Sequence, residues 1–278
     1  MESKFFNISS YSVENKSNFS FDLPFNYHNI AYLKIKSIEI PHTIYSFSTS
    51  KDNLTATLTF NTVDYTITIS EGNYTPATII TEIQDKLNTI NTTTGEDFTI
   101  SLNSINNKIT FSNNSASASN FTLDFTRATN SLYPHMGYYL GFTEESYTGS
   151  NTYTGINQIN LIDTNYVYLK LNDLENIRDP VVKYPFAKIM LKNNELNTYY
   201  IKEEDIIGNA YYFRSPQNLK RINIKLVDYK DNELTLTPFN ITLTLEIGYI
   251  YDLNLYKQLQ HIKYPQNTGF DSRLIFKN

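Results

Sequence analysis

The chain has 278 residues and a formal net charge of −5, and its 40% hydrophobic and 14% aromatic content is enough for one large β domain or two smaller ones. The 23 Tyr and 17 Phe, together with many Thr and Ile, favour pleated strands over helices. There is no cysteine, which excludes disulfides, thiolate nucleophiles and cysteine-ligated metals.

The first 51 residues predict two strands after a polar start. Residues 1–16 are irregular in pattern, and they lack the basic patch and apolar run of a secretory signal. Phe19, Phe21 and Leu23 alternate with polar residues in a first strand that we expect Pro24 to end. Ala31–Ile40 is the second strand. Its alternation shifts near Lys36–Ser37, which predicts either a bulge or a bend between sheets.

Residues 52–149 predict a compact α+β insertion. Two hairpins are expected, Leu54–Ile69 with its turn at Asn61–Thr62 and Phe98–Phe111 with its turn at Asn106–Asn107. Thr92–Asp97 is expected to be a loop before the second hairpin. Phe121, Leu123 and Phe125 alternate with polar residues and predict a further strand. A short helical turn is expected within Arg127–Phe142, and a loop at Thr143–Thr154.

The main helix signal lies between these hairpins, within Glu71–Ile90. Thr75 is placed to cap the helix, and Pro76 occupies the first helical position, where its missing N–H costs no hydrogen bond. Apolar residues then recur at helical spacing and form one stripe. They are Ile79, Ile80, Ile83, Leu87 and Ile90.

Residues 150–252 return to strands. The predicted strands are Tyr166–Asn172, Phe186–Leu191, Tyr199–Ile201, Leu219–Val227 and Ile241–Ile247. The last segment, 253–278, is basic and weakly periodic, which indicates an arm. Short strands separated by turns are typical of an all-β sandwich or jelly roll. We therefore expect a single jelly roll split into 1–51 and 150–252, an inserted α+β domain with one main helix at 52–149, and a C-terminal arm.

The charge is unevenly divided between these parts. Residues 52–149 hold three basic and ten acidic side chains, a balance of −7, while the rest of the chain holds 20 basic and 18 acidic ones, a balance of +2. The two regions either face different surroundings or differ only in a solvated acidic surface. Neither has the basic stripe of a specific nucleic-acid binder, and no apolar run approaches the ~18–20 residues of a membrane-spanning helix.

The sequence contains no catalytic motif and predicts no catalytic, cofactor-binding or metal-ligating residue. His28, His42, His135 and His261 are not at ligand spacing. The carboxylate clusters Glu144–Glu145 and Glu203–Asp205 are expected to be solvated loop charges, because adjacent side chains point in different directions. Three aromatic runs are either core residues at strand ends or exposed stacking surfaces. They are Tyr138–Tyr139, Tyr199–Tyr200 and Tyr211–Phe213.

Several segments occur in an order that resembles a known family. They are SNFSFDLP (17–24), YLKIKSIEIPHTIYSF (32–47), EGNYTPATIITEIQDKL (71–87), LGF (140–142), YVYLKLNDL (166–174) and INIKLVDYKDNEL (222–234). With its segments in this order, the chain resembles the penton proteins, or vertex minor capsid proteins, of virophages, polinton-like viruses and related giant DNA viruses. The resemblance is to pentons of the Mavirus type.

The resemblance implies a structural capsid protein without enzymatic activity or cofactors. It implies a homopentamer at each fivefold vertex of the virion, double jelly-roll major capsid proteins as neighbours, and an insertion that projects outward. Jelly-roll strand edges, loops such as Asp173–Lys183 and the two terminal arms are expected to contribute contacts. A further partner to consider is a surface receptor of the host or helper virus, bound through the insertion. The alternative is a carbohydrate- or receptor-binding module of a viral fibre, and a glycosidase using Glu203 or Glu144 is third.

Overall fold

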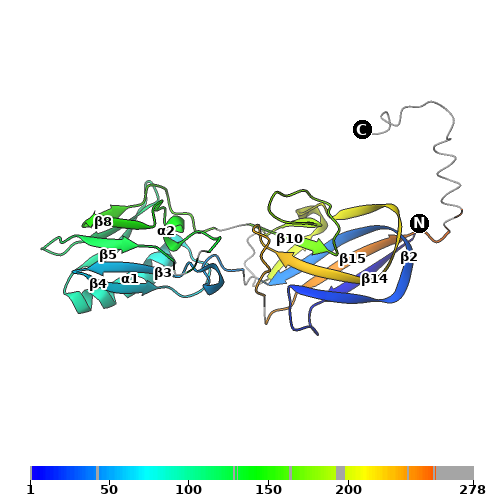
Figure 1. Ribbon diagram of the computed structural model, residues 1–278, viewed down its shortest axis with the longest axis horizontal. Coiled ribbons are helices and arrows are strands. Elements are labelled where there is room, and N and C mark those ends of the chain that lie inside the picture. The colour runs from blue at the N-terminus through cyan, green and yellow to red at the C-terminus, as the bar shows by residue number, and fades with distance from the viewer. Residues whose placement is uncertain are drawn as a thin grey trace, which may run out of the picture. The chain divides into compact units, whose positions relative to one another are not determined.

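The computed structural model describes residues 2–41, 44–127, 129, 131–162, 165–191, 198–236, 238–252 and 254. The chain divides into two compact units (Figure 1). The jelly-roll unit comprises the described residues of 1–42 and 166–278, and the inserted unit comprises those of 43–165. The range 52–149 lies within the inserted unit, which also holds residues on either side of that range. The arm expected at 253–278 lies outside the described residues, except for residue 254.

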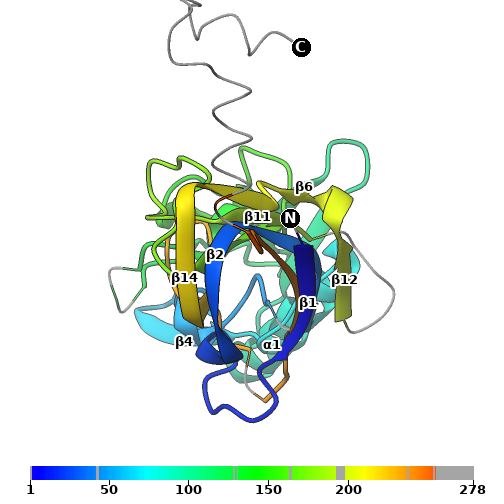
Figure 2. The ribbon, with the colours of Figure 1, turned by 90° about the vertical axis from the view of Figure 1, so that its right-hand side faces the viewer.

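The jelly-roll unit is built on one curled antiparallel sheet. Its strand order is β1-β15-β2-β14-β10-β11-β13, and β12 also pairs with β2. Figure 2 shows β14, β2 and β1 curving around the interior of this unit. The all-β jelly-roll class is therefore confirmed. The strands are β1 (Glu2–Ser9), β2 (Asn18–Pro41), β10 (Tyr166–Leu171), β11 (Ala187–Met190), β12 (Thr198–Lys202), β13 (Ile206–Ile207), β14 (Ala210–Val227) and β15 (Thr242–Tyr249).

Strand β2 corrects one prediction and confirms another. It is a single strand of 24 residues, so Pro24 does not end it. Its pairing with β14 is irregular here: Asp22 pairs with Arg221 and the next partner is Tyr27. Pro24 is tolerated because it lies in this gap, where no ladder N–H is required. The bulge expected near Lys36–Ser37 is present, since the register with β15 skips Lys36.

Strand β1 corrects the prediction that residues 1–16 are irregular. Its polar residues carry no strong strand pattern, yet Glu2–Ser9 pairs with β15 in an unbroken register. Only Ile8 is fully buried. The strand exists because β15 offers a hydrogen-bonding edge, which is a tertiary effect.

The core of the jelly-roll unit lies between the inner faces of these strands. Ile222, Ile224 and Leu226 from β14 are fully buried, as the alternation in Leu219–Val227 predicts. Leu243, Leu245 and Ile247 supply the same pattern from β15. The predicted strands in 150–252 are all present, although β14 begins earlier, at Ala210.

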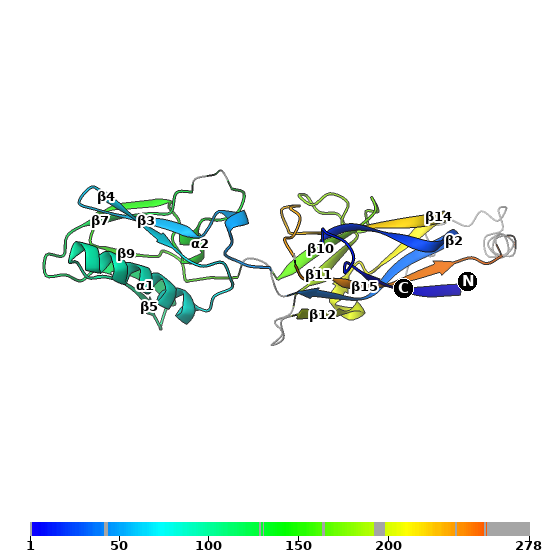
Figure 3. The ribbon, with the colours of Figure 1, turned by 90° about the horizontal axis from the view of Figure 1, so that it is seen from below.

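The inserted unit contains two small sheets and the main helix. The sheets have the orders β4-β3-β7-β8 and β5-β6-β9. Figure 3 shows α1 along the β5 side of this unit. The elements are η1 (Thr49–Lys51), β3 (Thr55–Phe60), β4 (Val63–Thr68), α1 (Pro76–Thr94), β5 (Phe98–Asn103), β6 (Lys108–Asn113), β7 (Phe121–Asp124), α2 (Met136–Tyr139), β8 (Ser146–Ser150) and β9 (Thr152–Thr154).

Helix α1 begins as predicted and ends later. The Thr75 hydroxyl accepts the Thr78 N–H at 3.2 Å, and the Thr75 N–H donates to the Thr78 hydroxyl at 2.9 Å, which forms a capping box. The helix continues to Thr94 and is capped by Gly95 at φ +73°, so the loop expected at Thr92–Asp97 is shorter. Four of the five stripe residues are buried, and Ile80 is half-buried.

The stretch Thr143–Thr154 is not the loop that its Ser, Thr and Gly content predicts. It forms β8, which pairs with β7, and β9, which pairs with β6. Tyr153 explains part of the difference, because its ring is buried and its hydroxyl donates to the Phe121 carbonyl at 2.6 Å. No helix in the described part of the chain is long and apolar enough to cross a membrane.

Candidate functional site

The two histidines that the structure describes belong to different units. His28 is exposed on β2, and His135 is buried beside α2 in the other unit. His42 and His261 lie outside the described residues. Within the described ranges, no three His, Asp or Glu side chains are grouped so that they could hold a metal ion.

The carboxylate clusters take part in ion pairs at the surface. Glu203 contacts both Lys34 and Lys36, and Lys36 also approaches Glu246 at 4.0 Å. Hydrogen bonds from the two lysines lower the pKa of Glu203. Glu145 lies 4.0 Å from Arg127 in the inserted unit. These contacts are ion pairs between carboxylates and basic side chains. Glycoside hydrolysis requires a different arrangement, in which two carboxylates face each other across the scissile bond.

Each aromatic run divides between core and surface. Tyr139 and Tyr199 are buried, whereas their neighbours Tyr138 and Tyr200 are exposed. In Tyr211–Phe213 the middle residue is 69% exposed and the outer two are half-buried. This division follows from strand alternation at the last two runs.

The loop Asp173–Lys183 is held by local hydrogen bonds. The Asp179 carboxylate accepts the N–H groups of Val181 and Val182, and the Tyr168 hydroxyl donates to it at 2.8 Å. The Asn176 side chain donates to the Gly208 carbonyl at 2.6 Å. Val181 is exposed, and its N–H is held by Asp179. An apolar side chain on a backbone fixed in this way suits a contact surface.

Within the described residues, one flank of the jelly-roll unit is open, and β1 forms its edge. Among the described strands β1 pairs only with β15, so its second hydrogen-bonding edge is free over eight residues. The strand has no bulge and no proline, and Phe5 is 62% exposed. Natural edge strands are normally shortened, twisted or interrupted, because a regular free edge pairs readily with another strand.

Aromatic side chains gather beside this edge. Phe6 of β1 contacts Phe21 at 6.5 Å and Tyr27 at 5.5 Å between ring centroids, both edge to face. Tyr27 also contacts Phe25 at 6.4 Å and Tyr249 at 6.2 Å. We call Phe6, Phe21, Phe25, Tyr27 and Tyr249 the flank cluster. Phe25 is 70% exposed, and the other four rings are half-buried.

The rings of the flank cluster are only partly covered by the rest of the described chain. Aromatic rings with part of their surface in water, next to a free strand edge, are typical of surfaces that bind another protein. Strand edges in general were expected to supply contacts, but sequence reasoning missed this cluster of rings. The alternation in β2 predicts which rings face inward, but it does not show which of those rings remain uncovered. The signal that was available is the density of aromatic residues within 5–27.

Comparisons with known proteins give one kind of match. No family model matches the chain, and no curated protein matches it. Among solved structures the mavirus penton protein is similar, with a TM-score of 0.51 and 11% sequence identity. The superposition covers 90% of this chain and 100% of that chain. The similarity therefore extends over both units and concerns the fold, and we conclude that this chain has a penton-like fold.

Proposed function

We propose that this protein is a structural component of a viral capsid, without enzymatic activity. The observation that carries the proposal is the penton-like fold, which is similar to the mavirus penton protein over 90% of this chain. The surface ion pairing of Glu203 with Lys34 and Lys36 agrees with a structural role for this carboxylate.

At finer detail, five copies surround each fivefold vertex of the virion, and the inserted unit points outward. A fivefold ring requires a heterologous interface, in which one flank of each copy meets a different flank of the next. The flank cluster and the free edge of β1 suit one side of such an interface. Double jelly-roll major capsid proteins are the outer neighbours, and assembly takes place in the infected cell.

Light scattering and negative-stain imaging of the purified protein test this proposal. We expect five-membered rings, alone or after co-expression with a double jelly-roll major capsid protein from the same virus. Phe25→Ser is expected to leave monomers, because it removes the most exposed ring of the flank cluster while changing stability little. Tyr11→Ser is the matched control, since Tyr11 is 79% exposed and lies outside the cluster.

Two results would overturn the vertex assignment. One is a stable trimer, which is the symmetry of a fibre. The other is a protein that stays monomeric both alone and beside the major capsid protein.

A further inference from the structure

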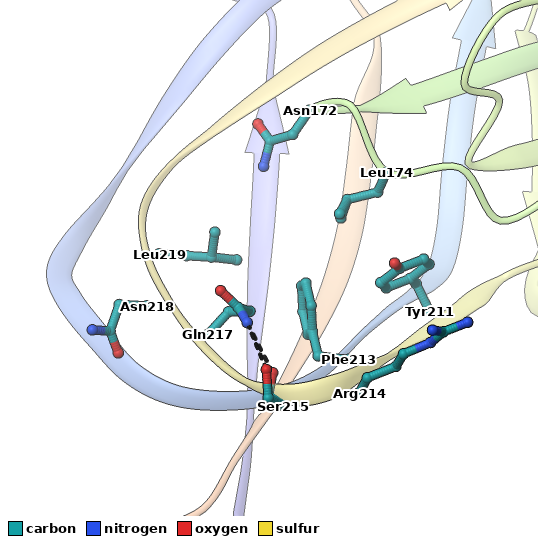
Figure 4. A pocket seen from close by; sticks show the side chains of 9 residues that line it. All are labelled: Asn172, Leu174, Tyr211, Phe213, Arg214, Ser215, Gln217, Asn218 and Leu219. Atoms are coloured by element: carbon teal, nitrogen blue, oxygen red, sulfur yellow. Dashed lines mark hydrogen bonds between the residues drawn. The ribbon is translucent and has the colours of Figure 1, made fainter.

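A pocket of about 400 Å³ opens where β14 bends in the jelly-roll unit (Figure 4). The pairing of β14 with β2 shifts register between Tyr212 and Gln217 and again before Leu219, so the strand leaves the regular ladder here. The pocket is lined by this part of β14 and by Asn172 and Leu174, which follow β10. The volume lies within the range of small-molecule sites, about 300–1,000 Å³. The pocket is lined by Asn172, Leu174, Tyr211, Phe213, Arg214, Ser215, Gln217, Asn218 and Leu219.

Two aromatic rings form one side of the pocket. Tyr211 and Phe213 lie on the same face of β14, with centroids 5.2 Å apart at an interplanar angle of 72°. Tyr212, between them in sequence, is on the opposite face against Tyr32 at 5.5 Å. Figure 4 shows both pocket rings together with Leu174 and Leu219. These groups offer ring faces and methyl groups to a ligand with an apolar side.

The polar groups of the pocket retain unused hydrogen-bonding atoms. Asn172 Oδ1 accepts the Asn223 N–H at 2.9 Å, which leaves Asn172 Nδ2 as a donor. Gln217 Nε2 donates to the Ser215 carbonyl at 3.0 Å and to its hydroxyl at 3.1 Å, which leaves Gln217 Oε1 as an acceptor. Neither remaining atom has a partner among the described residues. In Figure 4 the Asn172 amide nitrogen points into the pocket.

The lining has one charged side chain, Arg214, and no carboxylate. A neutral ligand with a flat apolar face fits this set, because Arg214 is exposed and its charge can stay solvated. It must also present an acceptor for Asn172 Nδ2, a donor for Gln217 Oε1 and a small apolar group for the leucines.

We propose that this pocket binds an N-acetylhexosamine residue of a glycan. The C–H face of the pyranose ring stacks on Phe213 or Tyr211, whose ring faces carry partial negative charge. The acetamido carbonyl accepts from Asn172, and the acetamido N–H donates to Gln217. Its methyl group packs against Leu174 and Leu219. Glycan binding here is a function beyond capsid architecture, and it uses the jelly-roll unit.

The test compares two trisaccharides by calorimetry and NMR titration of the full chain. Tri-N-acetylchitotriose carries the acetamido group on each ring, and cellotriose carries a hydroxyl at the same position. We expect the first to bind with a dissociation constant of about 1 mM or lower and the second to bind about tenfold more weakly. Equal binding of the two sugars, or no binding of the first at about 10 mM, overturns the proposal.

Variants of neighbouring residues on β14 locate the site. Phe213→Ala is expected to weaken binding of tri-N-acetylchitotriose about tenfold, and Phe213→Tyr to retain it, because the ring face is kept. Tyr212→Ala is the matched control, since its ring is on the other face of the same strand. Unchanged binding by Phe213→Ala, or loss of binding in Tyr212→Ala, contradicts the assignment. Circular dichroism confirms that each variant is folded. Failure of these titrations leaves ring assembly, and so the proposed function, unaffected.

Discussion

At the residue scale, the environment of His135 makes the inserted unit sensitive to pH. It is 8% exposed, its Nδ1 accepts the Tyr138 N–H at 3.2 Å, and its ring stacks on Phe125. Burial lowers the pKa of His135, the nearby Arg127 lowers it further, and Glu145 opposes both.

The lowered pKa predicts that acid destabilises the inserted unit. The unfolded chain binds a proton on this histidine at a higher pH than the folded chain does, so stability falls as pH decreases below about 6.5. The slope is at most about 1.4 kcal/mol per pH unit. His135→Asn keeps an acceptor for the Tyr138 N–H and should remove this part of the slope in urea unfolding at pH 5.5 and 7.5. His28→Asn, at an exposed position, should leave it in place. An unchanged slope in His135→Asn would refute the assignment.

At the element scale, α1 depends on its N-terminal cap. Thr75→Ala removes the acceptor for the Thr78 N–H, and we expect a loss of about 1 kcal/mol of unfolding free energy. Thr75→Ser should keep most of the unfolding free energy that Thr75→Ala loses, because serine retains the hydroxyl acceptor. Thr93→Ala, at an exposed position of the same helix, should be neutral or slightly stabilising, since alanine is the better helix former. Urea titration measures all three, and equal effects of the two alanine variants would contradict the cap argument.

At the scale of the whole molecule, the two units have separate cores. Leu87 is fully buried in the core of the inserted unit, together with Ile79 and Ile83 of the same helix. Leu87→Ala should therefore cost about 2–5 kcal/mol in that unit. Hydrogen exchange should increase in peptides from 44–162 and stay nearly unchanged in β14 and β15, because domains open as separate cooperative units. A uniform increase over both units would show that they unfold together.

The local pattern of the sequence was sufficient for the elements whose stabilising contacts are themselves local. The cap at Thr75, the stripe ending at Ile90 and the turn at Asn61–Thr62 each depend on residues a few positions apart, so each was predictable. The bulge at Lys36 was predictable for the same reason, since a shift in alternation is visible along one strand.

The elements that sequence reasoning missed depend on distant partners. β1, β8 and β9 form because other strands offer them an edge, and Pro24 is accepted because β14 leaves a gap in its ladder. Gly248 shows the same dependence: a Cβ there would lie 1.9 Å from the Tyr32 ring on the neighbouring strand. Composition and periodicity by themselves determined the all-β class, the inserted helix and the main strands, because these follow from local burial patterns. The open flank and the pocket on β14 were decided only by the tertiary structure, since whether a side chain remains uncovered depends on what the rest of the chain brings to it.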